Sequence, residues 1–131
     1  MRVSLDTSAY SALDRGHVGI LTTLEHADEI ILSVIAIAEL LSGFGAGRHY
    51  QRNRSELQRF LGLPNVMAGN LDFTTADRYA EIAVYLRRQG TPVPTNDILI
   101  AAHAMQHGLQ VVTLDKHFQA MPQVSIQLFG P

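Results

Sequence analysis

Short apolar runs of strand length alternate with segments of helical periodicity along this chain. The clearest runs lie at residues 3–5, at about residues 29–34 and at residues 110–114. Continuous apolar runs rich in β-branched residues are typical of strands that are buried on both faces, as in parallel sheets. A helix is the usual connection between parallel strands. The alternation therefore predicts an α/β fold, a three-layer α/β/α sandwich around a mostly parallel central sheet.

The composition limits the class of protein further. A chain of 131 residues suits a single domain spanning residues 1–131, and 47% apolar with 17% charged residues is globular rather than disordered. The net charge of −2 means that any binding of nucleic acid must come from a local basic patch. The absence of cysteine excludes disulfides and thiolate metal sites.

The hydropathy pattern gives no reason to expect a membrane protein. The N-terminus reads MRVSLD, without the apolar segment of a signal peptide. The longest nearly apolar run, residues 30–38, is far shorter than the roughly 20 residues that span a bilayer. We expect a protein of the cytoplasm.

Small and polar residues set the expected ends of the helices. Thr7 or Ser8 is the expected N-cap of the first helix, and Gly43, Gly45 and Gly47 are expected to end the helix that carries Glu39 and to form a flexible linker. Thr74 or Thr75 is the expected N-cap of the long helix that follows, and Thr95 is the expected N-cap of the next helix. Their expected C-terminal residues are Gly90 and Gly108.

Four acidic residues fall at corresponding places in this pattern. Asp6 and Asp115 each follow an apolar strand, Asp97 begins an apolar helix, and Glu39 lies in the first turns of a helix that follows a strand. Ligands of open α/β sheets bind beyond the carboxyl ends of the strands. We therefore expect the four carboxylates on one edge of the sheet.

Carboxylates gathered in this way need a cation. At close range each carboxylate raises the pKa of its neighbours, and burial raises it further. Oxygen ligands select a hard ion, Mg²⁺ or Mn²⁺, and the chemistry that follows is metal-assisted phosphodiester hydrolysis. The alternative is that Asp6, Asp97 and Asp115 are helix caps or turn residues. Glu39 fits that alternative least, because a glutamate between Ala38 and Leu40 is rarely buried unpaired.

The segments around the acids resemble a known family. LDTSAYSAL, AIAELLSG, TNDILIAAHA and VVTLDKHF are similar to the four acidic motifs of PIN-domain nucleases. Their order and spacing, from Asp6 to Phe118, resemble the VapC-type toxins of toxin–antitoxin pairs. The resemblance implies a Mg²⁺-dependent endoribonuclease in which Asp6 and Asp97 bind the metal most directly. Glu39 and Asp115 would complete the cluster, binding a second metal or orienting water.

The same resemblance implies partners and supporting residues. It implies an RNA substrate, a homodimer, and a small cognate antitoxin whose C-terminal arm covers the active groove. Thr113, with Thr7 or Ser8, matches polar positions of the family that support the acids.

Two weaker patterns leave alternatives open. Arg48, Arg52 and Arg59 are spaced to share a helix face, which is either a track for RNA phosphates or a solvated face. His103 and His107 are four residues apart and could bind Zn²⁺, but no HExxH glutamate or third ligand accompanies them. We expect both histidines to be bystanders.

Other functions compete with the nuclease. A non-catalytic RNA- or protein-binding module on the same fold would not need the four acids. A phosphatase of the haloacid-dehalogenase type would need a second acid two residues after Asp6, where this chain has Ser8. A phosphoreceiver domain would need a paired acid beside the first strand, which is not visible.

Overall fold

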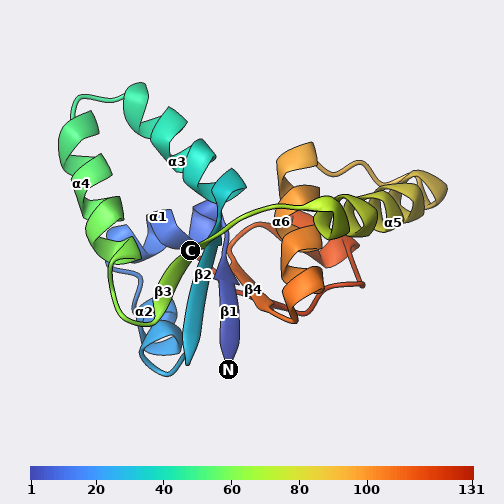
Figure 1. Cartoon of the computed structure of the whole chain (residues 1–131), viewed down its shortest axis with the longest axis horizontal. Coiled ribbons are helices and arrows are strands. Elements are labelled where there is room, and N and C mark those ends of the chain that lie inside the picture. The colour runs from blue at the N-terminus through green and yellow to red at the C-terminus, as the bar shows by residue number, and fades with distance from the viewer.

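The computed structural model describes all 131 residues and contains one five-stranded sheet (Figure 1). Its strands are β1 (Arg2–Leu5), β2 (Glu29–Ser33), β3 (Val66–Gly69), β4 (Gln110–Thr113) and β5 (Ile126–Leu128). The strand order is β3-β2-β1-β4-β5, and every neighbouring pair is parallel. The predicted α/β fold with a mostly parallel sheet is confirmed, and the sheet is parallel throughout.

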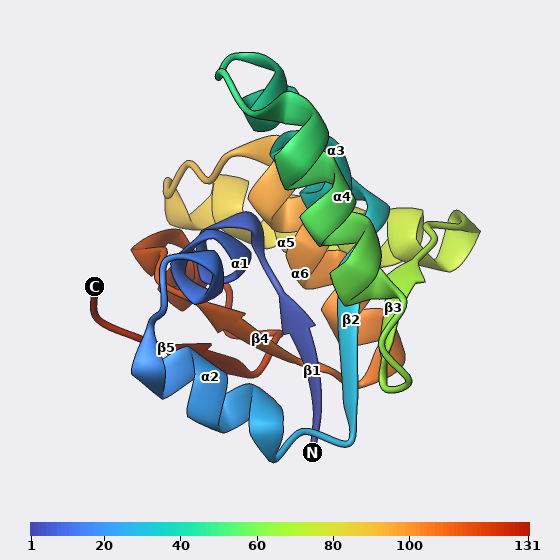
Figure 2. The ribbon, with the colours of Figure 1, turned by 90° about the vertical axis from the view of Figure 1, so that its left-hand side faces the viewer.

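Helices cover both faces of this sheet. They are α1 (Thr7–Asp14), α2 (Val18–Glu25), α3 (Val34–Gly45), α4 (Tyr50–Leu61), α5 (Phe73–Gln89) and α6 (Thr95–His107), with a short 3₁₀ helix, η1 (Lys116–Ala120). Helices α1, α2 and α4 pack on one face, and α5 and α6 pack on the other (Figure 2). None of these helices has the length and hydropathy needed to cross a bilayer.

The strands place alternate side chains in two separate apolar layers. In β2, Ile30 and Leu32 belong to one core cluster, whereas Ile31 belongs to the other. In β4, Val112 and Val111 divide in the same way. Successive side chains of a strand point to opposite faces, so a strand with both faces buried must be apolar at every position. This is the physical origin of the continuous apolar runs in the sequence.

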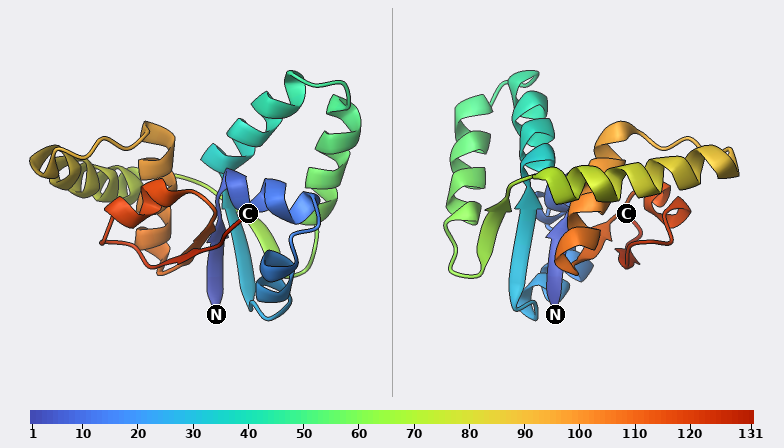
Figure 3. Two further views of the ribbon diagram at one scale, coloured as in Figure 1. Left: turned by 180° about the vertical axis from the view of Figure 1, so that it is seen from behind. Right: turned by 45° about the vertical axis from the view of Figure 1, so that its right-hand side comes forward.

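The strand order reverses direction between β1 and β4. The chain runs outward from β1 to β2 and β3, and then crosses to the other side of β1 to form β4 and β5. The α3–α4 pair extends beyond the carboxyl edge of the sheet, and the α5–α6 pair lies on the opposite side (Figure 3). Ligand sites of open parallel sheets lie at such a reversal of strand order. Asp6 directly follows β1 here, and Asp115 follows β4 after one intervening residue.

The glycines after Glu39 do not all act as predicted. Helix α3 continues through Gly43 and Gly45, so the predicted end of the helix and flexible linker are wrong there, and only Gly47 lies beyond the helix. A glycine inside a helix costs roughly 0.5–1 kcal/mol relative to alanine, which disfavours a helix without preventing it. The packing of Leu40 and Leu41 against the core offsets that cost.

The helix caps differ from the predicted threonines. Helix α5 begins with a capping box in which Asp72 Oδ1 accepts from the Thr75 amide at 3.1 Å and Thr75 Oγ1 accepts from the Asp72 amide at 3.0 Å. Helix α6 has no side-chain cap and starts at Thr95 directly after Pro94. The predicted caps Thr74, Thr75 and Thr95 are therefore wrong. The predicted C-terminal glycines are confirmed, since Gly90 and Gly108 have φ values of 66° and 65°.

Candidate active site

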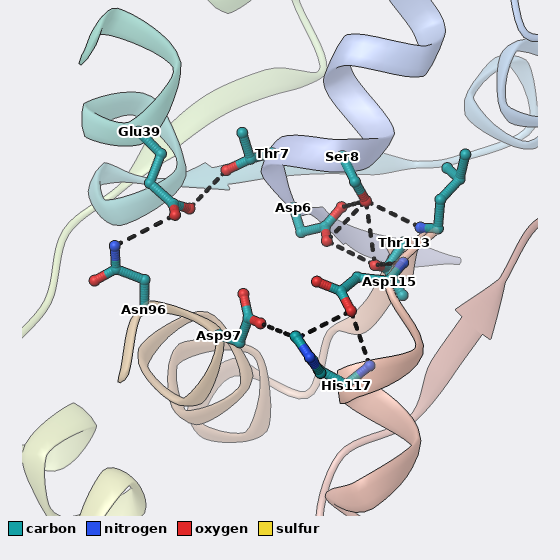
Figure 4. Close-up of polar contacts among 10 residues, drawn as sticks. Asp6, Thr7, Ser8, Glu39, Asn96, Asp97, Thr113, Asp115 and His117 are labelled. Atoms are coloured by element: carbon teal, nitrogen blue, oxygen red, sulfur yellow. Dashed lines mark hydrogen bonds and ion pairs between the residues drawn. The ribbon is translucent and has the colours of Figure 1, made fainter. Parts of the chain in front are cut away.

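Asp6, Glu39 and Asp115 lie around the fourth acid, Asp97, at the carboxyl edge of the sheet (Figure 4). Asp6 directly follows β1, and Asp115 directly precedes η1. Glu39 lies in the second turn of α3, and Asp97 lies in the first turn of α6. The charges of Asp115 and Glu39 raise the pKa of Asp97, and the charge of Asp97 raises the pKa of Asp6. The structure thus brings together the carboxylates that the sequence separates by up to 109 positions, since 115 − 6 = 109.

Asp6 is buried and fully supplied with hydrogen bonds. Its side chain is the N-cap of α1, accepting from the Ala9 amide at 2.9 Å, so the predicted caps Thr7 and Ser8 are wrong. Ser8 Oγ donates to Asp6 Oδ1 at 2.8 Å, and Thr113 Oγ1 donates to Asp6 Oδ2 at 2.6 Å. Burial raises the pKa of Asp6, and the donors Thr113, Ala9 and Ser8 oppose that rise. Asp6 therefore carries the structural role of a cap as well as a place in the acidic cluster.

Thr113 and Ser8 fix β4 to the end of β1. The Thr113 hydroxyl that donates to Asp6 also accepts from the Asp115 amide at 2.8 Å. Ser8 Oγ accepts from the Leu114 amide at 3.0 Å. Two hydroxyls thus set the position of Asp115 relative to Asp6, and the polar contacts expected near the acids are present.

Glu39 is held from two sides. Thr7 Oγ1 donates to Glu39 Oε1 at 2.7 Å, and Asn96 Nδ2 donates to Glu39 Oε2 at 3.3 Å. Glu39 is half-buried and lines an open cavity of about 490 Å³ between α3 and the start of α6. The cavity is lined by apolar, small and polar residues: Ile35, Ala38, Glu39, Ser42, Gly43 and Asn96. Asn96, which precedes Asp97, had no recognisable pattern in the sequence.

A histidine that the sequence analysis did not single out joins Asp97 and Asp115. His117 Nδ1 lies 3.1 Å from Asp97 Oδ2 and 3.1 Å from Asp115 Oδ1. One ligand atom from each of these three residues lies within 4.8 Å of the others. Burial raises the pKa of Asp97, the hydrogen bond from His117 lowers it, and Asp115 and Glu39 raise it. The group is the chain's only set of three or more histidine or acidic side chains with this spacing.

The site meets the chemical requirements of a divalent cation. Two carboxylates and an imidazole nitrogen converge within ligand distance, and the carboxylates of Asp6 and Glu39 lie nearby. Burial disfavours the ionised form of both Asp6 and Asp97, as expected of acids that lack a neutralising charge. A cation at this edge would remove that penalty.

The weaker sequence patterns contribute little to this site. His103 is 2% exposed, its ring centroid is 4.7 Å from that of His107, and burial lowers its pKa. Neither histidine belongs to a group with metal-binding spacing. Arg48 lies before the start of α4, so only Arg52 and Arg59 of the predicted arginine stripe are on the exposed surface of that helix.

Comparison with known proteins identifies the family of this chain. The model of the PIN domain matches residues 3–124 of the chain. The tRNA(fMet)-specific endonuclease VapC of Salmonella typhimurium is 30% identical over 103 residues, which cover 78% of this chain and 76% of the relative. Ribonuclease VapC1 of Rickettsia felis is 31% identical over 117 residues, covering 88% of this chain and 86% of the relative.

A solved structure extends the likeness to nearly the whole chain. The crystal structure of VapBC2 from Rickettsia felis bound to a promoter DNA fragment contains a chain that matches with a TM-score of 0.87 and 25% identity. The match covers 98% of this chain and 99% of that one. The chain therefore belongs to the PIN-domain family, within which its relatives are VapC ribonucleases.

Proposed function

We propose that the chain is a Mg²⁺-dependent endoribonuclease of the cytoplasm that acts as the toxin of a type II toxin–antitoxin pair. The observation that carries the proposal is the convergence of Asp6, Glu39 and Asp115 on Asp97 at the reversal of strand order. The relatives, which are named as a ribonuclease and an endonuclease, support the same activity.

The chain's own residues define how such a site would work. Asp6 and Asp97 are the proposed direct ligands of the cation, and Asp115, which has ligand spacing to Asp97, completes the set. A bound Mg²⁺, or Mn²⁺ in its place, would lower the pKa of a bound water molecule and stabilise negative charge on the phosphoryl oxygens. Glu39, held by Thr7 and Asn96, is the carboxylate that we propose orients or deprotonates the attacking water.

We propose that the substrate strand enters the open cavity beside Glu39. A phosphate there would face the Glu39 carboxylate, whereas a neutral ribose or base would not be repelled. Asn96 uses an amide N–H on Glu39 and keeps its carbonyl oxygen for another partner. We therefore expect the nucleotide next to the scissile phosphate to occupy this cavity.

The proposed partners are a cognate antitoxin and a second copy of the chain. Solved relatives are VapBC complexes with DNA, from Rickettsia felis and from Salmonella typhimurium. We expect a neighbouring gene to encode a short DNA-binding protein that co-purifies with this chain and suppresses its activity. Sedimentation of the purified chain tests the homodimer separately.

Cleavage mapping after pulse expression tests the activity. Total RNA from cells that express the wild type should show new ends at a small set of sites, and cells that express Asp97→Asn should not. Equal amounts of the two proteins, checked on blots, serve as the control. Binding of RNA by the wild type without new ends, across several RNAs and with either Mg²⁺ or Mn²⁺, would instead favour the non-catalytic binding module.

A further inference from the structure

The imidazole of His117 lies between two acids of the proposed metal centre. Its Nδ1 atom is 3.1 Å from Asp97 Oδ2 and 3.1 Å from Asp115 Oδ1 (Figure 4). A ring nitrogen at equal distance from two carboxylate oxygens, within a group spanning no more than 4.8 Å, has the arrangement of one more ligand.

The local fold fixes this position. Asp115 is the N-cap of η1, and its Oδ1 accepts from the His117 amide at 2.9 Å. The next residue, Phe118, is fully buried and anchors the short helix in the core. The backbone of His117 is therefore tied to one acid of the cluster, and its side chain is directed to the carboxyl edge of the sheet.

We propose that His117 is a nitrogen ligand of the divalent centre and makes the site prefer Mn²⁺ to Mg²⁺. This inference rests on the proposed function, in which Mn²⁺ can take the place of Mg²⁺, and it says which of the two ions the same site binds more tightly. Mg²⁺ favours oxygen ligands and keeps several waters, whereas imidazole is a better ligand for first-row transition ions. Two carboxylates with one imidazole form a mixed oxygen–nitrogen set, so replacing the imidazole removes affinity mainly for the transition ion.

A different role for the same contact makes the opposite prediction. If His117 were only an ion-pair partner of Asp97 and Asp115, the incoming cation would have to displace it. Removal of the imidazole would then leave the affinity for the cation unchanged or raise it. The two roles are therefore separated by the sign of the change in affinity.

The test is Mn²⁺ binding to tag-free protein, measured without RNA. Electron spin-echo envelope modulation detects a nitrogen bound directly to Mn²⁺, and calorimetry gives the affinities for Mn²⁺ and Mg²⁺. The variant is His117→Gln. The His117 side chain is 51% exposed, so we expect the fold to tolerate its replacement. The matched control is His26→Gln, an exposed histidine that precedes β2 at the opposite edge of the sheet.

The wild type and His26→Gln should show the nitrogen coupling, and His117→Gln should lose it. The affinity for Mn²⁺ should fall roughly tenfold or more in His117→Gln, with a smaller change for Mg²⁺. A coupling that is absent from the wild type or persists in His117→Gln overturns the proposal, as does an unchanged or higher Mn²⁺ affinity in that variant.

Asp97→Asn separates this inference from the function on which it rests. If Asp97→Asn binds Mn²⁺ as well as the wild type does, the proposed metal centre itself is wrong. If Asp97→Asn loses Mn²⁺ while His117→Gln keeps both coupling and affinity, the centre stands and only the role of His117 is overturned.

Discussion

Thr113 donates a 2.6 Å hydrogen bond to Asp6 and thereby joins the carboxyl ends of β4 and β1. The same hydroxyl accepts from the Asp115 amide, so one side chain sets the separation of two acids of the cluster. The strand pairing brings Thr113 to this place, because Leu5 is in register with Val112, one residue before it. The geometry of the site is thus an outcome of the sheet register.

Replacing Thr113 by valine should destabilise the protein and reduce its activity. The variant keeps the shape of the side chain but removes a donor to a buried carboxylate, at a cost of about 1–3 kcal/mol in the free energy of unfolding. Thr113→Ser keeps the hydroxyl and should remain near the wild type. Urea unfolding of both variants measures the effect, and equal stability of the valine and serine variants would contradict it.

The contribution that Asp6 and Asp97 make to the stability of the metal-free protein should fall as pH rises from acid toward neutral. Burial raises the folded-state pKa of Asp6 and Asp97 above the ordinary value of 3.8. Each group then binds its proton more tightly in the folded than in the unfolded protein, so its stabilising contribution is complete below pH 3.8 and is lost as pH rises through the folded pKa. Thermal unfolding of the wild type and of Asp97→Asn in a chelator, compared across this range, measures the Asp97 part of the trend.

Asp97→Asn should reduce that pH dependence and raise the midpoint of thermal unfolding at neutral pH. The substitution removes the negative charge of Asp97, which burial disfavours and which the neighbouring charges of Asp115 and Glu39 disfavour further. Added Mn²⁺ should raise the midpoint of the wild type and leave the variant unchanged. If Asp97→Asn is less stable than the metal-free wild type at pH 7, then the charge of Asp97 does not destabilise the fold.

Loss of the Asn96 amide should slow cleavage only while Glu39 is present. Asn96→Ala removes the 3.3 Å hydrogen bond to Glu39 and leaves the Thr7 contact in place, so we expect a decrease of severalfold in kcat rather than a complete loss. In a Glu39→Gln background the same substitution should have a much smaller effect. Additive effects in this double-mutant cycle would mean that Asn96 acts independently of Glu39.

Gly69→Ala should destabilise the protein by about 1–3 kcal/mol through overpacking. A Cβ atom there would lie 2.6 Å from His103 Nε2 and 2.9 Å from Ile31 Cγ2. The double variant Gly69→Ala/His103→Ala should recover part of the loss, because the imidazole that blocks the methyl group is gone. Denaturant unfolding of Gly69→Ala, of the double variant and of His103→Ala alone measures the coupling between the two positions. If the two substitutions have additive effects, the predicted clash between the new methyl group and His103 is wrong.

The sequence predicted the fold and the gathering of acids because both follow from connectivity. Apolar runs buried on two faces identify parallel strands, and residues such as Asp6 that follow those strands reach the carboxyl edge in any such sheet. The roles of the four acids as ligands and catalysts are still predictions, since their geometry shows proximity rather than function.

The helix cap Asp72 and the positions of Asn96 and His117 depend on tertiary contacts, which no local sequence pattern predicts. Asp72 and Thr75 are both good caps three positions apart, and Gln106 of α6 donates to Asp72 at 2.8 Å from 34 positions away, which favours Asp72. Asn96 meets Glu39 across 57 positions. His117 has no repeat or spacing of its own, and only the turn that Asp115 caps directs it to the site.

The most direct test of the account is the chemistry of the ends that the purified protein leaves on RNA. With Mg²⁺ or Mn²⁺ present, attack by water should give linear phosphate ends, without a 2′,3′-cyclic phosphate. A chelator, or Asp97→Asn in a protein with an unchanged circular dichroism spectrum, should abolish cleavage. Cleavage that continues in the chelator, survives in Asp97→Asn or leaves cyclic phosphates would contradict a metal-dependent carboxylate site.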